Sequence, residues 1–191
     1  IKAQNPDLVF MVSYVADAIL LMRQSREMGL APKAFLGGGA GFDTAQFESE
    51  KEISNLVFSV TQWTPDMGTA GSAEFYERYS KQFGKKPTYH AACAYQAMMI
   101  MGETAAKAGG DRAKVSQILD TGTWTGIMGE VKFEDYEGFT NQNKHMMPVI
   151  QYQNGKAETV FCPGKVCKVK RERPARSAST ARSPIARPSR K

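Results

Sequence analysis

Short apolar runs alternate with amphipathic stretches along the first third of the chain. Residues 8–13 (Leu-Val-Phe-Met-Val-Ser) form a continuous apolar run, which is typical of a strand buried on both faces of a parallel sheet. Residues 18–28 then place apolar side chains at helical spacing, and Gly29 supplies a C-terminal cap. Two further strands are expected at 34–36 and 55–61, with a helical stretch between them at 44–50. This alternation predicts an α/β fold with a parallel sheet and flanking helices.

The pattern becomes mainly helical after Pro65. A helix over 73–83, with Ser72 as its cap, places Phe75, Tyr79 and Phe83 on one face. A longer helix rich in Ala and Met is expected over 89–108, and Asp111 caps a third, shorter one. A strand at 130–134 follows, and the strands 148–153 and 156–161 flank Asn154-Gly155, a strong hairpin signal.

The carboxyl ends of the three predicted parallel strands meet at one rim of the sheet. Parallel sheets bind ligands beyond these ends. Tyr14 follows the first strand, the glycines of F-L-G-G-G-A-G-F (35–42) follow the second, and Thr61–Trp63 follow the third. This rim is therefore the candidate site.

The glycine run allows three interpretations. Phosphate binding is disfavoured, because Phe42-Asp43-Thr44 stands where a phosphate-binding loop has Gly-Lys-Ser/Thr, and Asp43 would repel a phosphate. The dinucleotide fingerprint also fails, since Phe42 occupies the place of its third glycine. A purely structural turn and a pocket wall for a small uncharged or zwitterionic ligand both remain open.

Charge and composition narrow the function classes. The apolar runs are much shorter than the ~20 residues that a bilayer span needs, and no signal-peptide pattern is present. The opening residues look like the middle of a protein, so we expect a fragment. Residues 162–191 hold ten of the 25 basic residues and one of the 19 acidic ones, which leaves 15 basic and 18 acidic residues, a net charge of −3, on the rest. The folded body therefore has no electrostatic footprint for nucleic acid.

Reactive side chains give no catalytic or metal-binding pattern. Cys93 lies in an apolar helical run and is expected in the core, whereas Cys162 and Cys167 are close enough to form a bridge. The two histidines, His90 and His145, are interpreted as structural or surface residues. The acids nearest the rim, Asp17 and Asp43, are interpreted as helix caps. No catalytic residue, metal ligand or cofactor is predicted.

The composition changes at Cys162. From there to Lys191 the chain is rich in Pro, Arg, Ser and Ala and has no apolar face, so the sequence predicts a disordered basic tail. An appended or frameshifted end is one interpretation of this change. Salt-sensitive nucleic-acid binding by the tail, with Ser phosphorylation, is the other.

The order of several segments resembles a known family. These are NPDLVFMVSYVADAILLMRQSREMGL, FLGGGAGF, KKPTYHAACAYQAMMIMGETAAKAGG, GEVKFEDYEG and PVIQYQNGK, which together span roughly residues 3–161. The series resembles periplasmic solute-binding proteins of the leucine-, isoleucine- and valine-binding type, the receptors of ATP-driven (ABC) importers. The resemblance implies a type I periplasmic-binding-protein fold, in which two α/β lobes close around a ligand, with the start of the first lobe missing here.

The resemblance also assigns parts of the chain to the two lobes. Residues 1–62 correspond to the latter part of the second lobe, to which 146–161 return, and residues 63–145 to the first lobe, with a crossover at Trp63–Pro65. About half of a binding site would then be present. The implied ligand-binding residues are Tyr14, Gly38, Gly39, Ala40, Phe42 and Trp63. Gly39 stands where some relatives carry an acidic residue that pairs with the ligand's ammonium, so another group must supply that charge or the ligand is not a standard amino acid.

The predicted function is therefore solute binding without chemistry. The resemblance implies an amino acid-like ligand, a membrane permease of an ABC importer as partner, and a periplasmic or extracellular membrane-associated location. A ligand-sensing domain of a regulator or receptor shares the fold and is the main alternative. An enzyme is disfavoured, because no nucleophile–His–acid set is apparent.

Overall fold

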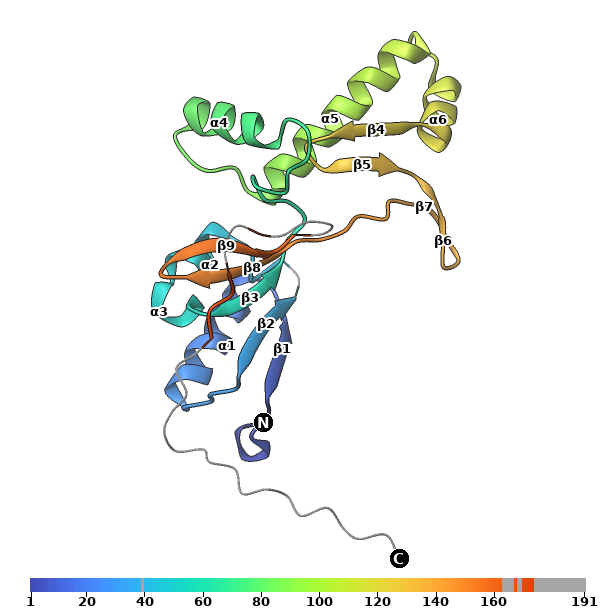
Figure 1. Ribbon diagram of the computed structural model, residues 1–191. Coiled ribbons are helices and arrows are strands. Elements are labelled where there is room, and N and C mark those ends of the chain that lie inside the picture. Colours follow the sequence, from blue (N-terminus) through green and yellow to red (C-terminus); the bar gives the residue numbers. More distant parts are fainter. Residues whose placement is uncertain (39, 163–166, 168–169, 174–191) are drawn as a thin grey trace, which may run out of the picture.

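The computed structural model describes residues 1–38, 40–162, 167 and 170–173 (Figure 1). The described chain forms two units. The sheet unit contains a five-stranded sheet with three helices, and the helical unit contains three helices with a two-stranded hairpin. A short 3-10 helix, Lys2–Gln4, precedes the first strand.

The strands of the sheet unit lie in the order β1-β2-β3-β8-β9. Their bounds are Leu8–Val12, Ala34–Gly38, Val57–Val60, Val149–Gln153 and Lys156–Phe161. The first three pair in parallel, which confirms the predicted βαβ arrangement. Strand β8 pairs antiparallel with β3 and forms the predicted hairpin with β9. Asn154 and Gly155 both have positive φ in its turn, at 53° and 76°.

Three helices cover one face of this sheet: α1 (Val15–Glu27), α2 (Ala45–Ser49) and α3 (Lys51–Ser54). Alternate strand residues point toward them and form the first hydrophobic core with Ala18 and Met22 of α1. The rings of Phe42, Phe47 and Tyr152 pack edge to face, with centroids 5.3 Å apart. The hydroxyl of Tyr152, buried in this core, donates a hydrogen bond of 2.9 Å to the carbonyl of Phe42.

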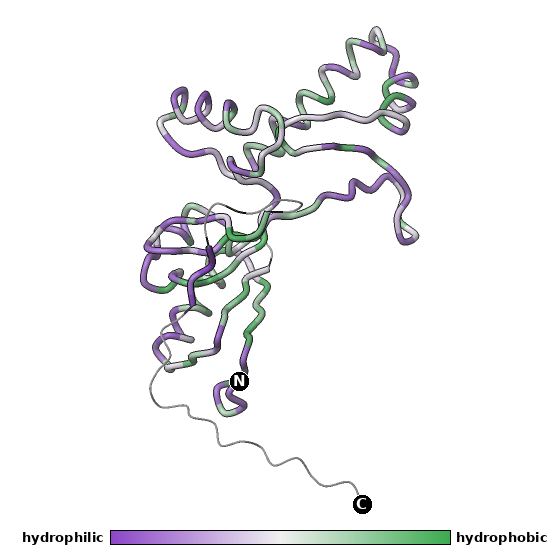
Figure 2. The backbone as a smooth tube through the Cα atoms, viewed as in Figure 1, coloured by the Kyte–Doolittle hydropathy of each residue, from purple (hydrophilic) through white to green (hydrophobic). Residues whose placement is uncertain are grey.

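The other face of the sheet has no helix over it in the described chain. Leu8, Phe10 and Val12 of β1 are 54%, 61% and 67% exposed, and Figure 2 shows the first strands as hydrophobic along their length. The expectation that residues 8–13 form a strand buried on both faces is therefore wrong for this chain. The reason is that an apolar run indicates a strand made for two covered faces, but the described residues supply a covering layer on one face only.

The helical unit forms the second hydrophobic core. It contains α4 (Ser72–Phe83), α5 (Tyr89–Ala108), α6 (Arg112–Thr121) and the hairpin of β4 (Thr123–Gly126) and β5 (Gly129–Lys132). An aromatic series runs from Trp63 through Phe75 and Tyr79 to Phe83, with centroids 4.6–5.8 Å apart. The helices match their predicted ranges. The strand expected at 130–134 is divided between β5 and β6 (Glu134–Tyr136), which pairs with β7 (Phe139–Gln142).

One predicted helix cap is confirmed, and three are corrected. Asp111 accepts hydrogen bonds from the backbone N–H groups of Ala113 and Lys114, as expected for the cap of α6. Ser72 does not precede α4, because Gly71 occupies that position. Asp17 lies inside the first turn of α1. Thr44, not Asp43, caps α2 by accepting a hydrogen bond from the N–H of Phe47 at 3.1 Å.

The two units contact each other close to the chain segments that connect them. The hydroxyl of Thr159 in β9 donates a hydrogen bond of 2.7 Å to Asp66. Lys86 lies between α4 and α5, and its Nζ is 3.8 Å from Oε1 of Glu48 in α2. Within the part of the chain that the structure describes, no helix is long and apolar enough to cross a bilayer.

A disulfide joins Cys162, directly after β9, to Cys167. Of the segment predicted to be disordered from residue 162 on, the described residues 170–173 lie beside β8, where Gln151 and Gln153 hydrogen-bond to their backbone. The remainder of that segment lies outside the described residues, so the prediction stays a prediction there.

Candidate functional site

The ends of β1 and β2 meet at the predicted rim of the sheet. The strand register pairs Val12 with Gly38, so the residues that follow both strands leave the sheet side by side. The N–H of Gly41 donates a hydrogen bond of 3.0 Å to the carbonyl of Ser13, directly before Tyr14. The Tyr14 side chain is 76% exposed. The sequence prediction that Tyr14 and the glycine run share one rim is therefore confirmed.

Close packing explains two of the glycines in this run. A Cβ at Gly37 would overlap the side chain of Phe42, which folds back under the sheet. A Cβ at Gly41 would overlap the backbone of Ser13 and Tyr14. Neither glycine has a positive φ, so what the bend requires is space, not an unusual backbone conformation. Gly39 lies outside the described residues.

The aromatic residues of the predicted pocket wall face away from the rim. Phe42 is fully buried in the first core, and its ring therefore supports the bend from below. Trp63 is 4% exposed in the second core, where its indole N–H donates a hydrogen bond of 2.9 Å to Ser72. The structure thus brings the exposed Tyr14 and the partly exposed Ala40 together at the rim surface, whereas Gly38 is buried against the ring of Phe10. The side chains of Phe42 and Trp63 pack in the cores.

The first turns of α5 lie against the same rim. The thiol of Cys93 donates a hydrogen bond of 3.1 Å to the side-chain carbonyl of Gln62, which follows β3. Tyr89 and His90 open this helix, and their rings stack with centroids 3.9 Å apart. The helical unit therefore places two rings beside the ends of the parallel strands. Sequence reasoning missed this, because nothing local to His90 indicates which part of the sheet α5 meets.

Asp43 is the charged side chain at the centre of this arrangement. Its burial raises the pKa of the carboxyl from 3.8 to about 6, while a hydrogen bond from Thr61 and the proximity of His90 oppose the shift. One carboxylate oxygen, Oδ2, is buried and has no hydrogen-bond partner in the described chain. The cap prediction missed this environment, because it depends on Thr61 and His90, which are distant in sequence.

The rim has the composition of a binding surface. It offers main-chain groups at the partly exposed Ala40, an exposed phenol at Tyr14, and one buried carboxyl at Asp43. Among the described residues, no three His, Cys, Asp or Glu side chains are placed to hold a metal ion. Such a surface can hold a small polar solute by main-chain hydrogen bonds and ring contacts.

An apolar groove in the helical unit adjoins the Cys93–Gln62 contact, since both of these residues line it. Its volume is about 560 Å³, and it opens between α5, α6, β5 and the segment before β8. Its lining includes Ile100, Met101, Leu119, Met128, Val131, Phe133 and Met147. Because Met98, Met99 and Met101 of α5 are also exposed, the described chain leaves one side of this helix without a covering layer. An exposed apolar face of this kind is a surface on which a further layer or another chain can pack.

Comparison with known proteins adds a family to this geometry. The periplasmic binding protein family matches residues 1–157. A Leu/Ile/Val-binding protein homolog from Brucella melitensis is 32% identical over 178 residues, covering 84% of this chain and 42% of the relative. The leucine-binding protein LivK from Thermotoga maritima superposes with a TM-score of 0.70 at 26% identity, over 84% of this chain and 46% of that one.

A more distant fold neighbour binds a different kind of molecule. A solute-binding protein of an ABC transporter from R. palustris, solved in complex with benzoate, superposes with a TM-score of 0.66 at 15% identity. The superposition covers 48% of that protein and 88% of this chain. The chain thus spans less than half the length of the relatives it matches.

We expect the substitution Gly37→Ala to destabilise the protein by about 1–3 kcal/mol, because the new methyl group collides with the packed ring of Phe42. Gly102→Ala is the matched control, since a Cβ there meets open space on α5 and Ala favours a helix. Urea denaturation measures both changes. Equal stability of the Gly37→Ala variant and the unmodified protein would contradict the packing argument.

Asp43 should make folding stability fall as pH rises. Because the folded carboxyl has a pKa of about 6 and the unfolded one 3.8, the folded state holds more protons between these values. The contribution of Asp43 to stability is therefore most favourable below about pH 4, and it falls by up to about 3 kcal/mol as pH rises from about 4 to above 6. Asp43→Asn should remove this loss. Denaturation at pH 4 and 7.5 measures how much Asp43→Asn stabilises the protein at each pH, with exposed Asp120→Asn as control. A stabilisation that is no larger at pH 7.5 than at pH 4 contradicts the assignment.

Proposed function

The chain belongs to the periplasmic binding protein family, and on that premise we propose that it forms about half of an interlobe cleft that binds an amino acid or a similar small polar solute. The observation that carries the proposal is the contact between Gly41 and Ser13. It holds the exposed Tyr14 beside the main chain of the glycine bend, opposite the start of α5. The binding surface is thus built from the ends of parallel strands, where this class of fold places ligands.

The two units correspond to parts of two lobes in this proposal. Residues 1–62, together with 146–161, supply the latter part of the second lobe, and 63–145 belong to the first. The separate hydrophobic cores of the sheet unit and the helical unit support this division. So does the small number of chain segments that connect them, residues 61–71 and 143–148. Closure would then be a hinge motion about these segments, driven by contacts that form only in the closed state.

Tyr14 and the main chain from Gly38 to Ala40 are proposed as direct ligand contacts. The side chain at position 39 adds no charge, so a ligand ammonium finds no carboxylate there. Phe42 and Trp63 are proposed to support the cleft from the two cores, since their rings are buried. His90, at the start of α5, is added to the proposed surface because it lies close enough to Asp43 to influence its pKa.

Asp43 supplies the negative charge of the cleft in this proposal. The carboxyl of Asp43 is buried, and this burial raises its pKa. Strongly shifted pKa values cluster at functional sites. In a poorly solvated cleft its charge acts over several ångströms without direct contact. A cationic group of the ligand would therefore be attracted to the rim when Asp43 is ionised.

The wider role proposed is that of an extracytoplasmic receptor that delivers its solute to the permease of an ABC importer. The family match and the solute-binding roles of the relatives support this. The family consists of solute-binding proteins, and no enzymatic role is proposed. The ligand-sensing domain of a regulator or receptor is the second candidate. It predicts the same ligand binding and differs in that the bound protein would not stimulate transport by a reconstituted permease.

The ligand proposal is tested by thermal shift on a fusion protein. In it, residues 1–191 are joined to the part of a relative, such as the Brucella melitensis homolog, that this chain does not span. A branched-chain or related amino acid at a hundredfold excess over its Kd should add about 2.7 kcal/mol of stability. Tyr14→Ala should remove the shift, whereas Tyr136→Ala, which alters an exposed ring on β6, should keep it. If no member of a panel of amino acids, amides and small acids changes the melting temperature, the proposed function is wrong.

The pH dependence of binding should reveal the charge of the ligand group near the rim. An ammonium group gains attraction as Asp43 ionises, so its affinity should rise as pH increases through about 6. A ligand with only a carboxylate there, such as benzoate, should bind more weakly over the same range. Calorimetric titrations at pH 5 and 7.5 distinguish the two. An Asp43→Asn variant that keeps the same pH dependence would show that Asp43 is not the source.

A further inference from the structure

Two buried glutamines stand on the uncovered face of the sheet. The strand register forms a row of Phe10, Leu36, Phe58 and Gln151 on this face, so Gln151 continues an otherwise apolar row. Gln151 is fully buried and Gln153 is 7% exposed, although neither faces the helix-covered core. A buried amide is stable only where its donors and acceptors find partners. The partners of these two amides therefore show what the surface is built to hold.

Both amides bind the backbone of residues 170–172. The side-chain carbonyl of Gln151 accepts a hydrogen bond from the N–H of Glu172 at 2.8 Å, and its amide nitrogen donates one to the carbonyl of Glu172 at 3.0 Å. This is the pairing that a neighbouring strand would offer. The amide nitrogen of Gln153 donates to the carbonyl of Lys170 at 2.9 Å and to the side-chain carbonyl of Gln151 at 2.8 Å.

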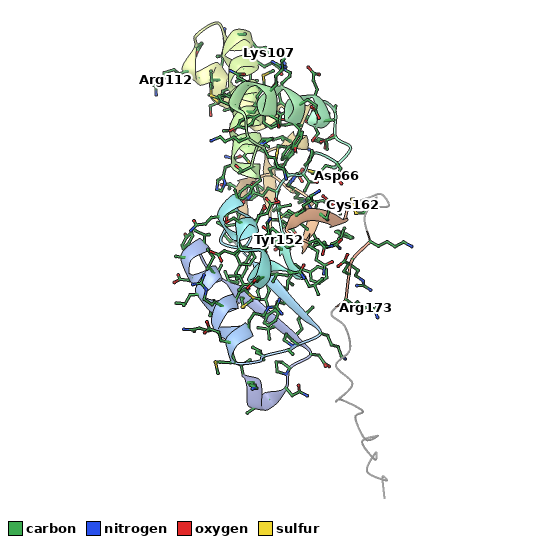
Figure 3. All side chains as sticks on the ribbon, turned by 90° about the vertical axis from the view of Figure 1, so that its left-hand side faces the viewer. Asp66, Lys107, Arg112, Tyr152, Cys162 and Arg173 are labelled. Carbon is green, nitrogen blue, oxygen red and sulfur yellow. A yellow bond between two sulfur atoms is a disulfide. The ribbon has the colours of Figure 1, made fainter. Side chains whose placement is uncertain are left out.

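We propose that the outer surface of β8 is a docking site for the main chain of an extended peptide, and that its occupant is residues 170–172 of this chain. In residues 170–172 the amides contact backbone groups only, and residues 170–173 are exposed. The site therefore recognises backbone groups of the peptide and tolerates different side chains. Figure 3 shows Cys162 and Arg173 on the same side of the sheet unit, away from α1.

The chain's own segment is favoured as occupant because the Cys162–Cys167 disulfide keeps it near the site. With the disulfide, about four links separate Cys162 from Lys170, and without it the path is eight residues. The free-energy cost of closing a loop grows as (3/2)RT ln n, so effective concentration falls with the 3/2 power of length. The disulfide therefore raises the effective concentration of the segment about threefold. A reductant such as dithiothreitol, which gives two electrons and two protons to form two thiols, should weaken docking by the same factor.

Trypsin cleavage after Lys170 measures docking, since a protease needs the backbone that the glutamines hold. Glu172→Pro removes the N–H that Gln151 accepts, and the loss of one hydrogen bond should speed cleavage of the full chain about fivefold. Glu172→Ala keeps the N–H and should leave the rate unchanged. Peptides of residues 167–175 carrying the same changes give the intrinsic rates for normalisation. If the two variants are cleaved equally fast after normalisation, the main-chain docking proposal is overturned.

The sheet side of the site is tested separately. Gln153→Met removes the donor to Lys170 and should speed cleavage about fivefold, whereas Gln117→Met, on exposed α6, should not. Circular dichroism verifies that both variants are folded. Reduction of the disulfide should speed cleavage about threefold. Protection that survives in Gln153→Met and after reduction would show that the segment is held by something other than this site. A foreign extended peptide that binds this surface without speeding cleavage after Lys170 would show that the site takes an occupant from another protein, and would overturn the assignment to residues 170–172.

Discussion

The tight packing of the glycine bend against the end of β1 is the constraint on which the candidate site depends. Gly41 hydrogen-bonds to Ser13, and neither Gly37 nor Gly41 has room for a side chain. This contact turns the chain back over Phe42, so that the ring seals the first core while Ala40 stays partly exposed. Tyr14 is thereby exposed next to the bend, although Gly38 and Gly41 are themselves buried. The rim then has the two components, ring and backbone, that a small polar solute needs.

Much of the fold could be predicted from local patterns, because these patterns have local causes. The apolar runs, the Asn154-Gly155 turn and the cap at Asp111 are each set by neighbouring residues, and the structure confirms them. The meeting of Tyr14 with the glycine run followed from the parallel order of β1 and β2. The antiparallel pairing of β8 with β3 was not predicted, since an isolated hairpin signal does not say which strand it joins.

The chemistry of the site was less predictable for the same reason. Asp43 looked like a cap, and only the tertiary structure brings Thr61 and His90 to it and buries it. Phe42 looked like a wall residue by adjacency, but its ring points into the core. The uncovered face of β1 shows the limit most plainly. Its hydrophobicity was visible in the sequence, whereas its exposure was not, because the pattern of the strand is that of relatives of which this chain spans less than half.

The central claim is that the bend and Tyr14 together line one wall of a solute cleft. A crystal structure of the complete two-lobed protein with its bound solute tests it most directly. The account predicts that the solute lies against the ring of Tyr14 and accepts or donates hydrogen bonds at the main chain between Gly38 and Gly41. A solute bound elsewhere, for example in the apolar groove of the helical unit, with the bend still packed on Ser13, would contradict it.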